Sequence, residues 1–267
     1  RVLFRSQGNV RAQVMLALMY QKGEGVPNDY VEAANWYLKA ARQGNVDAQI
    51  NLGLLYVSGK GVARDDAEAV KWFLKAAEQA DVNAQNNIAS MYLSGRGVEK
   101  NEKEAAKWYL KAAQQDNAYA QNMLGTMHQA GKGVSQDDVE AAKWFLKGAQ
   151  QGNAEAQVNM GMTYAEGKGV PQDDIEAAKW FHKAAEQGNT FAQYSLGVVY
   201  QQGKGVSQDD SEAVTWYRKA ARQGNITALN NLIQMSEKGN SVAQFNLGEM
   251  YQNGMGVAQN DIEVVKW

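Results

Sequence analysis

Six tryptophans follow one another at a constant spacing of 36 residues, and this period constrains the fold more than any other feature of the sequence. A period of that length indicates one supersecondary unit copied in tandem, because each copy can bury its apolar face only against its neighbours. A residue that recurs in every copy is therefore expected to serve the architecture, and specificity is expected where the copies differ. The tryptophans are Trp36, Trp72, Trp108, Trp144, Trp180 and Trp216, with a seventh, out of register, at Trp267.

Residues 45–80 show what one unit contains, and their pattern predicts two short helices joined by a tight loop. Asn45 is a favourable N-cap, and the apolar residues after it recur at helical spacing. Glycines from Gly59 onward predict the loop, and Asp65 with Glu68 three residues later is a capping-box pattern that opens the second helix. Each helix has about three turns and is marginal in isolation, so stacking on neighbouring units must stabilise it.

A small residue interrupts the first helix of almost every unit. It is Gly53 in this unit, and glycine inside a helix costs about 1 kcal/mol relative to alanine. We expect close approach by the backbone of the adjoining repeat to compensate for that cost. The same position holds Gly125, Gly161, Gly197 and Gly248, and alanine at Ala17 and Ala89.

The period predicts a single repeat domain over residues 1–267. The chain begins and ends inside the pattern, which indicates a piece of a longer gene product. Its parts are the tail of a preceding repeat at 1–8, regular repeats at 9–44, 45–80, 81–116, 117–152, 153–188 and 189–224, an irregular short unit at 225–239 and a truncated repeat at 240–267.

The irregular unit at 225–239 begins like a first helix, with Ala228 and Leu232 in apolar positions, and ends like a second helix at Gly239. One helix in place of a hairpin reverses the direction of everything after it. We therefore expect the final hairpin to pack at a different angle and to bend that end of the array. Such a bend either closes one end of a binding surface or is a harmless trace of duplication.

Composition argues against several classes of partner. The apolar content of 45% is enough for a continuous core, and the net charge of -2 gives no basic footprint for nucleic acid or an anionic membrane. No apolar run reaches the roughly 18 residues that a membrane span needs. The chain has no cysteine, so it has neither disulfides nor thiolate metal sites.

The residues that carry chemistry do not form a recognisable site. His128 and His182 share no metal-ligand spacing with other ligands, and no serine has a plausible base beside it. The "GKGV" loops lack the sequence context of a phosphate-binding loop, and the paired aspartates lack the spacing of a calcium loop. We therefore predict no catalytic residue, no cofactor and no metal, and a protein that is not an enzyme.

One repeated pattern resembles a known family. It is similar to the Sel1-like repeat, a relative of the tetratricopeptide repeat, and it returns in register along nearly the whole chain. The resemblance implies an all-α, right-handed superhelical solenoid of helix-turn-helix repeats that serves as a protein-binding scaffold. In the second unit the pattern lies at Ala48, Leu52, Gly53, Tyr56, Gly59, Gly61, Val62, Asp65, Ala69, Trp72, Lys75, Ala76 and Ala77.

The resemblance also bears on cellular role. It implies a bacterial protein of the periplasm or the secreted space, and more specifically an immunity or adaptor protein that sequesters a secreted effector or a host protein. A cysteine-rich branch of the family is associated with penicillin binding, but this chain lacks every cysteine. The rival functions are a cell-wall or small-molecule protein that binds or hydrolyses penicillin-type ligands, and a structural spacer between other domains.

One face of the first helix differs from repeat to repeat. It is made by the second, fifth and ninth residues after the cap, which lie on one side of a helix. The family resemblance implies that the first helices line the concave surface, so this face is expected to be the binding groove. Aromatic anchors dominate interface energetics, and we predict that Phe191, Tyr194 and Phe245 anchor a protein partner. The alternative is that these rings fill gaps between neighbouring helices. The other predicted contacts are Tyr119, Met162, Val158, Val198, Glu155 and Glu249.

Overall fold

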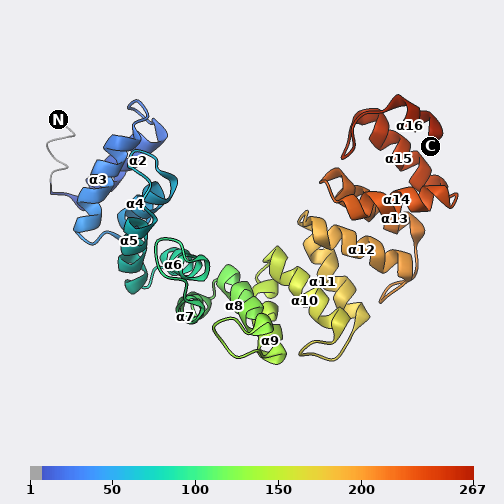
Figure 1. Ribbon diagram of the computed structural model, residues 1–267, viewed down its shortest axis with the longest axis horizontal. Coiled ribbons are helices and arrows are strands. Elements are labelled where there is room, and N and C mark those ends of the chain that lie inside the picture. Colours follow the sequence, from blue (N-terminus) through green and yellow to red (C-terminus); the bar gives the residue numbers. More distant parts are fainter. Residues whose placement is uncertain (1–7) are drawn as a thin grey trace. The chain divides into compact units, whose positions relative to one another are not determined.

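The computed structural model describes residues 8–267, and this part of the chain contains fifteen helices and no strand (Figure 1). The predicted all-α fold is therefore confirmed. The helices fall into two compact units, of which the first ends at Gln136 and the second begins at Asp137. The tail predicted at 1–8 lies, except for its last residue, outside the described residues.

Each regular repeat contributes a first and a second helix, and within each unit helices that are neighbours in sequence pack on one another. The helices of the first unit are α2 (Val10–Lys22), α3 (Tyr30–Arg42), α4 (Val46–Ser58), α5 (Asp66–Glu78), α6 (Val82–Ser94), α7 (Glu102–Ala113) and α8 (Ala118–Ala130). Those of the second unit are α9 (Asp138–Gln150), α10 (Ala154–Glu166), α11 (Asp174–Glu186), α12 (Thr190–Gln202), α13 (Asp210–Arg222), α14 (Ile226–Glu237), α15 (Ser241–Asn253) and α16 (Asp261–Lys266). Even-numbered helices up to α12, together with α15, are first helices.

The first helices have the caps that the sequence predicted. The Asn45 side chain accepts a hydrogen bond from the backbone N–H of Ala48, 2.8 Å away. Gly59 ends α4 in the left-handed conformation, with φ of 68°, which glycine adopts without a Cβ clash. The same two kinds of cap bound α2, α6, α8, α10, α12 and α15.

The second helices begin at a side-chain cap, but the predicted capping box is only half formed. Asp65 accepts hydrogen bonds from the backbone N–H groups of Ala67 and Glu68, each at 2.9 Å. In a complete box the Glu68 carboxylate would accept from the N–H of Asp65. That N–H instead donates to the carbonyl of Tyr56 at 3.0 Å, and Glu68 pairs with Lys71. The loop folds back on the first helix, and a carbonyl of that helix accepts the hydrogen bond that the Glu68 carboxylate would accept in a complete box.

The small residue inside the first helix serves a purpose other than the one predicted. A Cβ added at Gly53 would lie 2.6 Å from the ring of Phe73, which belongs to the second helix of the same hairpin. The glycine therefore makes room for a large ring within its own repeat, and our expectation of a backbone from the adjoining repeat was wrong. The same contact joins Gly161 to Phe181 and Gly197 to Tyr217.

Adjoining repeats approach each other closely at the second glycine of the regular loops. A Cβ added at Gly61 would lie 2.0 Å from the carbonyl oxygen of Tyr30, at the start of the second helix of the preceding hairpin. A buried glutamine adds a directional bond, because Gln49 Nε2 donates to the carbonyl of Ala41 in that hairpin at 3.2 Å. Gln79 in turn donates to Gln49 Oε1 at 2.9 Å. The stack is thus held by backbone proximity and amide hydrogen bonds as well as by apolar burial.

The recurring tryptophan and alanines form the core between the helices. Trp72, Ala76 and Ala77 are all buried, and small residues beside a large ring allow the helices to approach closely. The lysine three residues after each tryptophan lies over the indole ring, with Lys75 Nζ 4.5 Å from the ring centroid of Trp72. These lysines are exposed to solvent, and each also makes a cation–π contact with its tryptophan.

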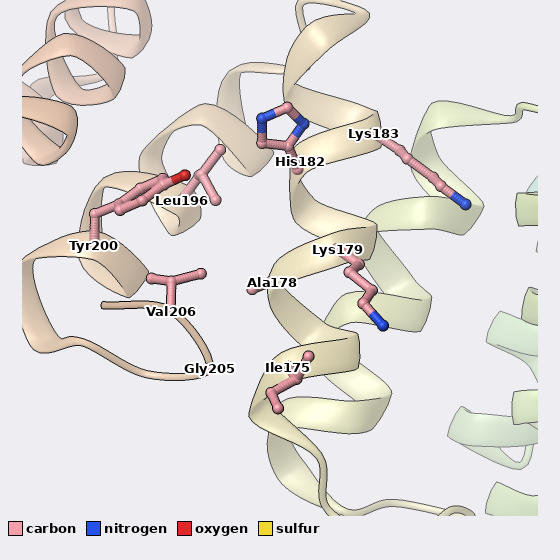
Figure 2. Close-up of a pocket in the computed structure, with 9 residues that line it drawn as sticks. All are labelled: Ile175, Ala178, Lys179, His182, Lys183, Leu196, Tyr200, Gly205 and Val206. Carbon is pink, nitrogen blue, oxygen red and sulfur yellow. The ribbon is translucent and has the colours of Figure 1, made fainter. Parts of the chain in front are cut away.

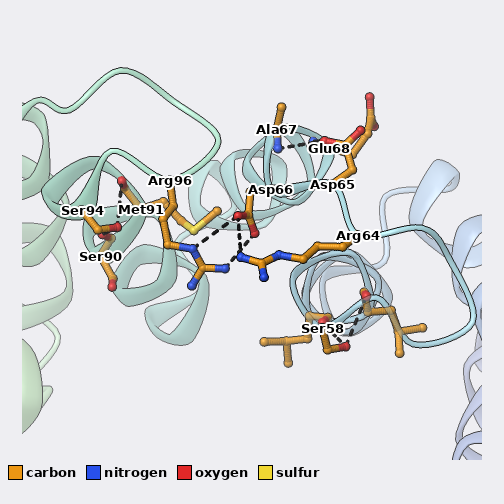
Figure 3. Close-up of polar contacts among 12 residues, drawn as sticks. Ser58, Arg64, Asp65, Asp66, Ala67, Glu68, Ser90, Met91, Ser94 and Arg96 are labelled. Carbon is orange, nitrogen blue, oxygen red and sulfur yellow. Dashed lines mark hydrogen bonds and ion pairs between the residues drawn. The ribbon is translucent and has the colours of Figure 1, made fainter.

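One ionic contact links two hairpins of the first unit (Figure 3). The Asp66 carboxylate in the first turn of α5 lies 3.2 Å from Arg64 Nη2 and 2.8 Å from Arg96 Nη2. Arg96 belongs to the loop of the next repeat. The hydrogen bond from Arg96 is the main cause that lowers the pKa of Asp66 below its ordinary value.

Regular stacking stops at α14, the single helix of the irregular unit. The position of the buried glutamine is Leu229 in this helix, which has no donor to offer the carbonyl of Ala221. A Cβ added at Gly256, in the loop of the final hairpin, would lie 2.3 Å from that same carbonyl oxygen, in the last turn of α13. Regular loop glycines meet the first turn of a second helix instead, as Gly205 does at Asp174. The final hairpin therefore docks on a different part of its neighbour.

Candidate protein-binding surface

The variable face of the first helices is not uniformly exposed. At the second position after the cap, Glu155 and Phe191 are exposed, with 45% of the Phe191 surface accessible. At the fifth position Val158 is only 5% exposed and packs in a core cluster with Phe181 and Ala192. The fifth residue therefore contacts the following hairpin, and the second residue remains available to a partner.

Tyr194, a predicted anchor, shows how the fifth position behaves for an aromatic residue. Its ring centroid lies 6.0 Å from that of Tyr217 on α13, and the side chain packs against the core cluster around α13 and α14. Val198, one turn further along, packs against the same cluster. These contacts favour the gap-filling alternative for both residues.

Four of the predicted residues meet at one hollow in the second unit, which we call the α10–α12 hollow. Glu155, Val158 and Met162 line it from α10. Phe191 lines it from α12, together with the cap Asn189 and with Thr190, and the hollow encloses about 480 Å³. Val158 and Met162 give it an apolar floor, and the predicted residues that come together here lie in two consecutive repeats.

The polar groups of the α10–α12 hollow are held in place by hydrogen bonds. Asn189 Nδ2 donates to Glu155 Oε1 at 2.8 Å, so the carboxylate is oriented towards the next repeat. Thr190 Oγ1 donates to Gln223 Oε1 at 2.9 Å. Asn189 was not predicted, because a cap residue whose pattern recurs is assigned to architecture, and Thr190 was not predicted, because it lies outside the second, fifth and ninth positions after the cap. Their place in the sequence, directly before the variable residue Phe191, was the feature that could have revealed them.

The remaining predicted residues lie elsewhere. Tyr119 belongs to the first unit, where its ring meets Tyr109 edge-on with centroids 6.2 Å apart. Glu249 is engaged within the chain, because its carboxylate lies 3.1 Å from Arg218 Nη1. Phe245 is 72% exposed, but it holds the fifth position, and in the described chain no first helix follows α15 to cover it. Its exposure alone is therefore no argument for a partner.

A second hollow, of about 400 Å³, lies between α11, α12 and the loop after α12 (Figure 2). Leu196, Tyr200 and Val206 line one side, and the two lysines on α11 are directed away from them. Lys179 is 2.6 Å from Glu176, and Lys183 lies over the Trp180 ring. His182 meets Trp216 edge-on, with ring centroids 5.6 Å apart. This hollow is apolar and brings no set of polar groups together.

Neither hollow has the composition of a catalytic or metal centre. Glu155 is the one titratable group among the six residues that line the α10–α12 hollow. Among residues 8–267 there is no group of three or more histidine, cysteine, aspartate or glutamate side chains placed to hold a metal ion. Over the same range no helix has both the length and the apolarity needed to cross a bilayer. The α10–α12 hollow combines an apolar floor with the exposed Phe191 ring and the Glu155 carboxylate.

Comparison with known proteins identifies the repeat. The model of the Sel1 repeat family matches residues 10–45, 46–81, 82–117, 118–153, 154–189, 190–225 and 241–267, and it leaves out the stretch that contains α14. None of the curated proteins compared with the chain matches it.

Two solved structures are similar over most of the chain. The protein c5321, described as a protective antigen present in uropathogenic Escherichia coli strains and displaying an SLR fold, is 40% identical with a TM-score of 0.79. The match covers 98% of this chain and 53% of that one, so this chain spans about half the length of the E. coli protein. A Sel1 repeat protein from Oxalobacter formigenes is 36% identical, with a TM-score of 0.76, over 80% of this chain and 88% of that chain.

Proposed function

The chain belongs to the Sel1 repeat family, and we propose that it is a scaffold that binds a partner protein through the α10–α12 hollow. Sel1 repeat proteins are typically protein-interaction scaffolds and generally not enzymes. The observation that supports the proposal here is Phe191, an exposed ring beside an apolar floor. Nothing in the packing of α12 requires a ring at that position, since Glu155 holds it in the preceding repeat and Arg11 in the first.

The distribution of shifted pKa values also favours binding over catalysis. Catalytic groups are commonly those with perturbed pKa values inside a cleft. In the second unit the clearest shift is that of Tyr217, whose pKa burial raises to about 12, and this residue packs in the core. A penicillin-type hydrolase would need an activated nucleophile, and the hollow contains none.

The first test replaces the ring and measures capture of a partner from the native cell. We expect Phe191→Ala to weaken capture at least tenfold, because truncating an aromatic hot spot typically costs about 2 kcal/mol or more. The melting temperature should stay within about 2 °C of the wild type, since an exposed side chain contributes little to folding. Affinity capture followed by quantitative mass spectrometry provides the measurement.

The control is Ile226→Ala, which removes an exposed apolar side chain at the start of α14, outside the hollow. It should leave capture unchanged. Equal capture by the wild type and by Phe191→Ala would count against the hollow as the binding site and in favour of a structural spacer. A loss of thermal stability in Phe191→Ala as large as that of a core variant would show that the ring fills a gap between neighbouring helices.

A further inference from the structure

The first helices of the second unit, together with the single helix α14, carry charge of one sign only. Helices α10, α12, α14 and α15 contain no lysine and no arginine. The basic residues of the helices in this unit all lie on α9, α11, α13 and α16. The acidic residues of the four basic-free helices are Glu155, Glu166, Glu237 and Glu249.

Glu155 differs from the acidic residues that already have a cationic partner. Glu166 lies 2.6 Å from Lys168, and Glu249 is paired with Arg218. For Glu155 the described structure shows the neutral amide of Asn189 as a donor and no lysine, arginine or histidine within ion-pair distance. The carboxylate thus lies at the edge of an apolar hollow with a neutral amide as its hydrogen-bond donor. Its neutral neighbour fixes its position without neutralising it.

The surroundings of Glu155 define the chemistry of a complementary group. The floor made by Val158 and Met162 suits an aliphatic stem, and Phe191 presents an aromatic ring to whatever enters. A cation is attracted both to a carboxylate and to the face of an aromatic ring. Arginine combines an apolar stem with a planar guanidinium that can stack on a ring while it donates to a carboxylate.

We propose that the α10–α12 hollow takes an arginine side chain presented by an extended segment of the partner protein. This inference rests on the proposed function and states which residue of the partner occupies the site. The stem lies on Val158 and Met162, the guanidinium donates to Glu155, and its plane lies against Phe191. An acidic segment is repelled by the same carboxylate, which gives the site its selectivity.

The experiment uses a library of random peptides selected for binding to the whole purified chain. Arginine should be enriched among peptides whose binding is lost in Phe191→Ala. The strongest peptide is then synthesised with its arginine and with citrulline, which has nearly the same shape but no charge. We expect the change to citrulline to weaken binding to the wild type about tenfold, the usual effect of removing one charge-assisted hydrogen bond.

The matched variants are Glu155→Gln, on α10 inside the hollow, and Glu237→Gln, on α14 outside it, and each removes one negative charge. In Glu155→Gln the arginine and citrulline peptides should bind nearly equally. In Glu237→Gln the tenfold preference should persist. Both variants should keep the wild-type melting temperature, because both carboxylates are exposed.

The possible failures are distinguishable. If peptides bind in a manner that depends on Phe191 but show no preference for arginine, or prefer lysine or acidic residues, the arginine site is overturned and the binding surface remains. If arginine peptides bind equally well to Glu155→Gln, the assignment of the carboxylate is overturned. If no selected peptide depends on Phe191, both the arginine site and the proposed function fail.

Discussion

Two junctions in the second unit solve the same packing problem in different ways. Where α12 follows α11, Gln193 Nε2 donates to the carbonyl of Ala185 at 3.3 Å, and the loop glycine Gly205 lies against the first turn of α11. Where α14 follows α13, the glutamine is replaced by Leu229, and the corresponding carbonyl is met by the loop of the final hairpin at Gly256. The first junction repeats along the chain, and the second occurs at the irregular unit.

The irregular junction carries its own ionic contact. Arg218 stands where most second helices have leucine, and it reaches α15, where its guanidinium donates to Asn246 and lies 3.1 Å from Glu249. The helix α14 still makes the regular amide bond at its other end, because Gln244 Nε2 donates to the carbonyl of Ser236 at 3.0 Å. The comparison teaches that a break in register is tolerated when side chains specific to that junction replace the repeated contacts.

The largest effect is expected from crowding the regular junction. A Cβ at Gly205 would lie 2.0 Å from the carbonyl oxygen of Asp174 and would also require a φ of 71°, so Gly205→Ala should lower the free energy of unfolding by about 3 kcal/mol or more. Gly188→Ala is the control, because its φ is similar but nothing lies within 4 Å of the added atom, and it should cost about 1 kcal/mol. Urea unfolding measures both.

The same crowding at the irregular junction should act locally. Gly256→Ala places its Cβ 2.3 Å from the carbonyl oxygen of Ala221. We expect faster hydrogen exchange in α15 and α16 and little change in α10 to α12, because only the final hairpin docks there.

If Gly205→Ala and Gly188→Ala lowered the free energy of unfolding equally, the close backbone contact at Gly205 would not matter for the stacking of the repeats.

The second effect in size concerns Arg218. Replacing it with leucine, as in the regular repeats, should destabilise the final hairpin by about 1–2 kcal/mol, because Glu249 and Asn246 lose a charged donor while partly buried. The matched change in the regular junction, His182→Leu, should stay within about 0.5 kcal/mol. A double-mutant cycle of Arg218→Leu with Glu249→Gln should give a coupling of about 1 kcal/mol. Absence of coupling would mean that Arg218 does not stabilise the hairpin through Glu249, which leaves its hydrogen bond to Asn246 and its packing.

The smallest effect is expected at the ionic contact between Asp66 and Arg96, within the regular stack of the first unit. The Arg96 side chain is more exposed than that of Asp66, so solvent weakens the ion pair. Arg96→Gln should therefore lower the free energy of unfolding by about 0.2–1 kcal/mol at neutral pH. Because the pKa of Asp66 is lowered in the folded state, this contribution is present above the unfolded value of 3.8 and is lost as the pH falls through the folded value.

The pH dependence separates that contact from a change in packing. The stability difference between the wild type and Arg96→Gln should shrink as the pH is lowered below about 4, whereas Arg42→Gln, on an exposed part of α3, should show no such trend. Urea titrations at several pH values provide the measurement. If the stability difference persists at low pH, Arg96 stabilises the loop through packing of its aliphatic stem.

The sequence by itself determined the period, the all-α fold, the caps and the place where the register breaks. These features depend on neighbours within one or two turns, so a local pattern records them. It also picked out Glu155, Met162 and Phe191 as variable positions, because such positions on a repeated scaffold can be found by aligning the repeats, and the structure brings these three residues to one hollow.

Only the tertiary structure decided which of the variable residues remain accessible to solvent. Val158 and Tyr194 share the predicted face with Phe191, but Val158 is buried and Tyr194 packs against Tyr217 and the core cluster around α13 and α14. The side chain that pairs with Glu249 lies 31 positions earlier, at Arg218. The incomplete capping box and the contact between Gly53 and Phe73 were missed for the same reason. Each depends on how the chain folds back on another helix, and helical periodicity says which side of a helix a residue occupies but not what packs against that side.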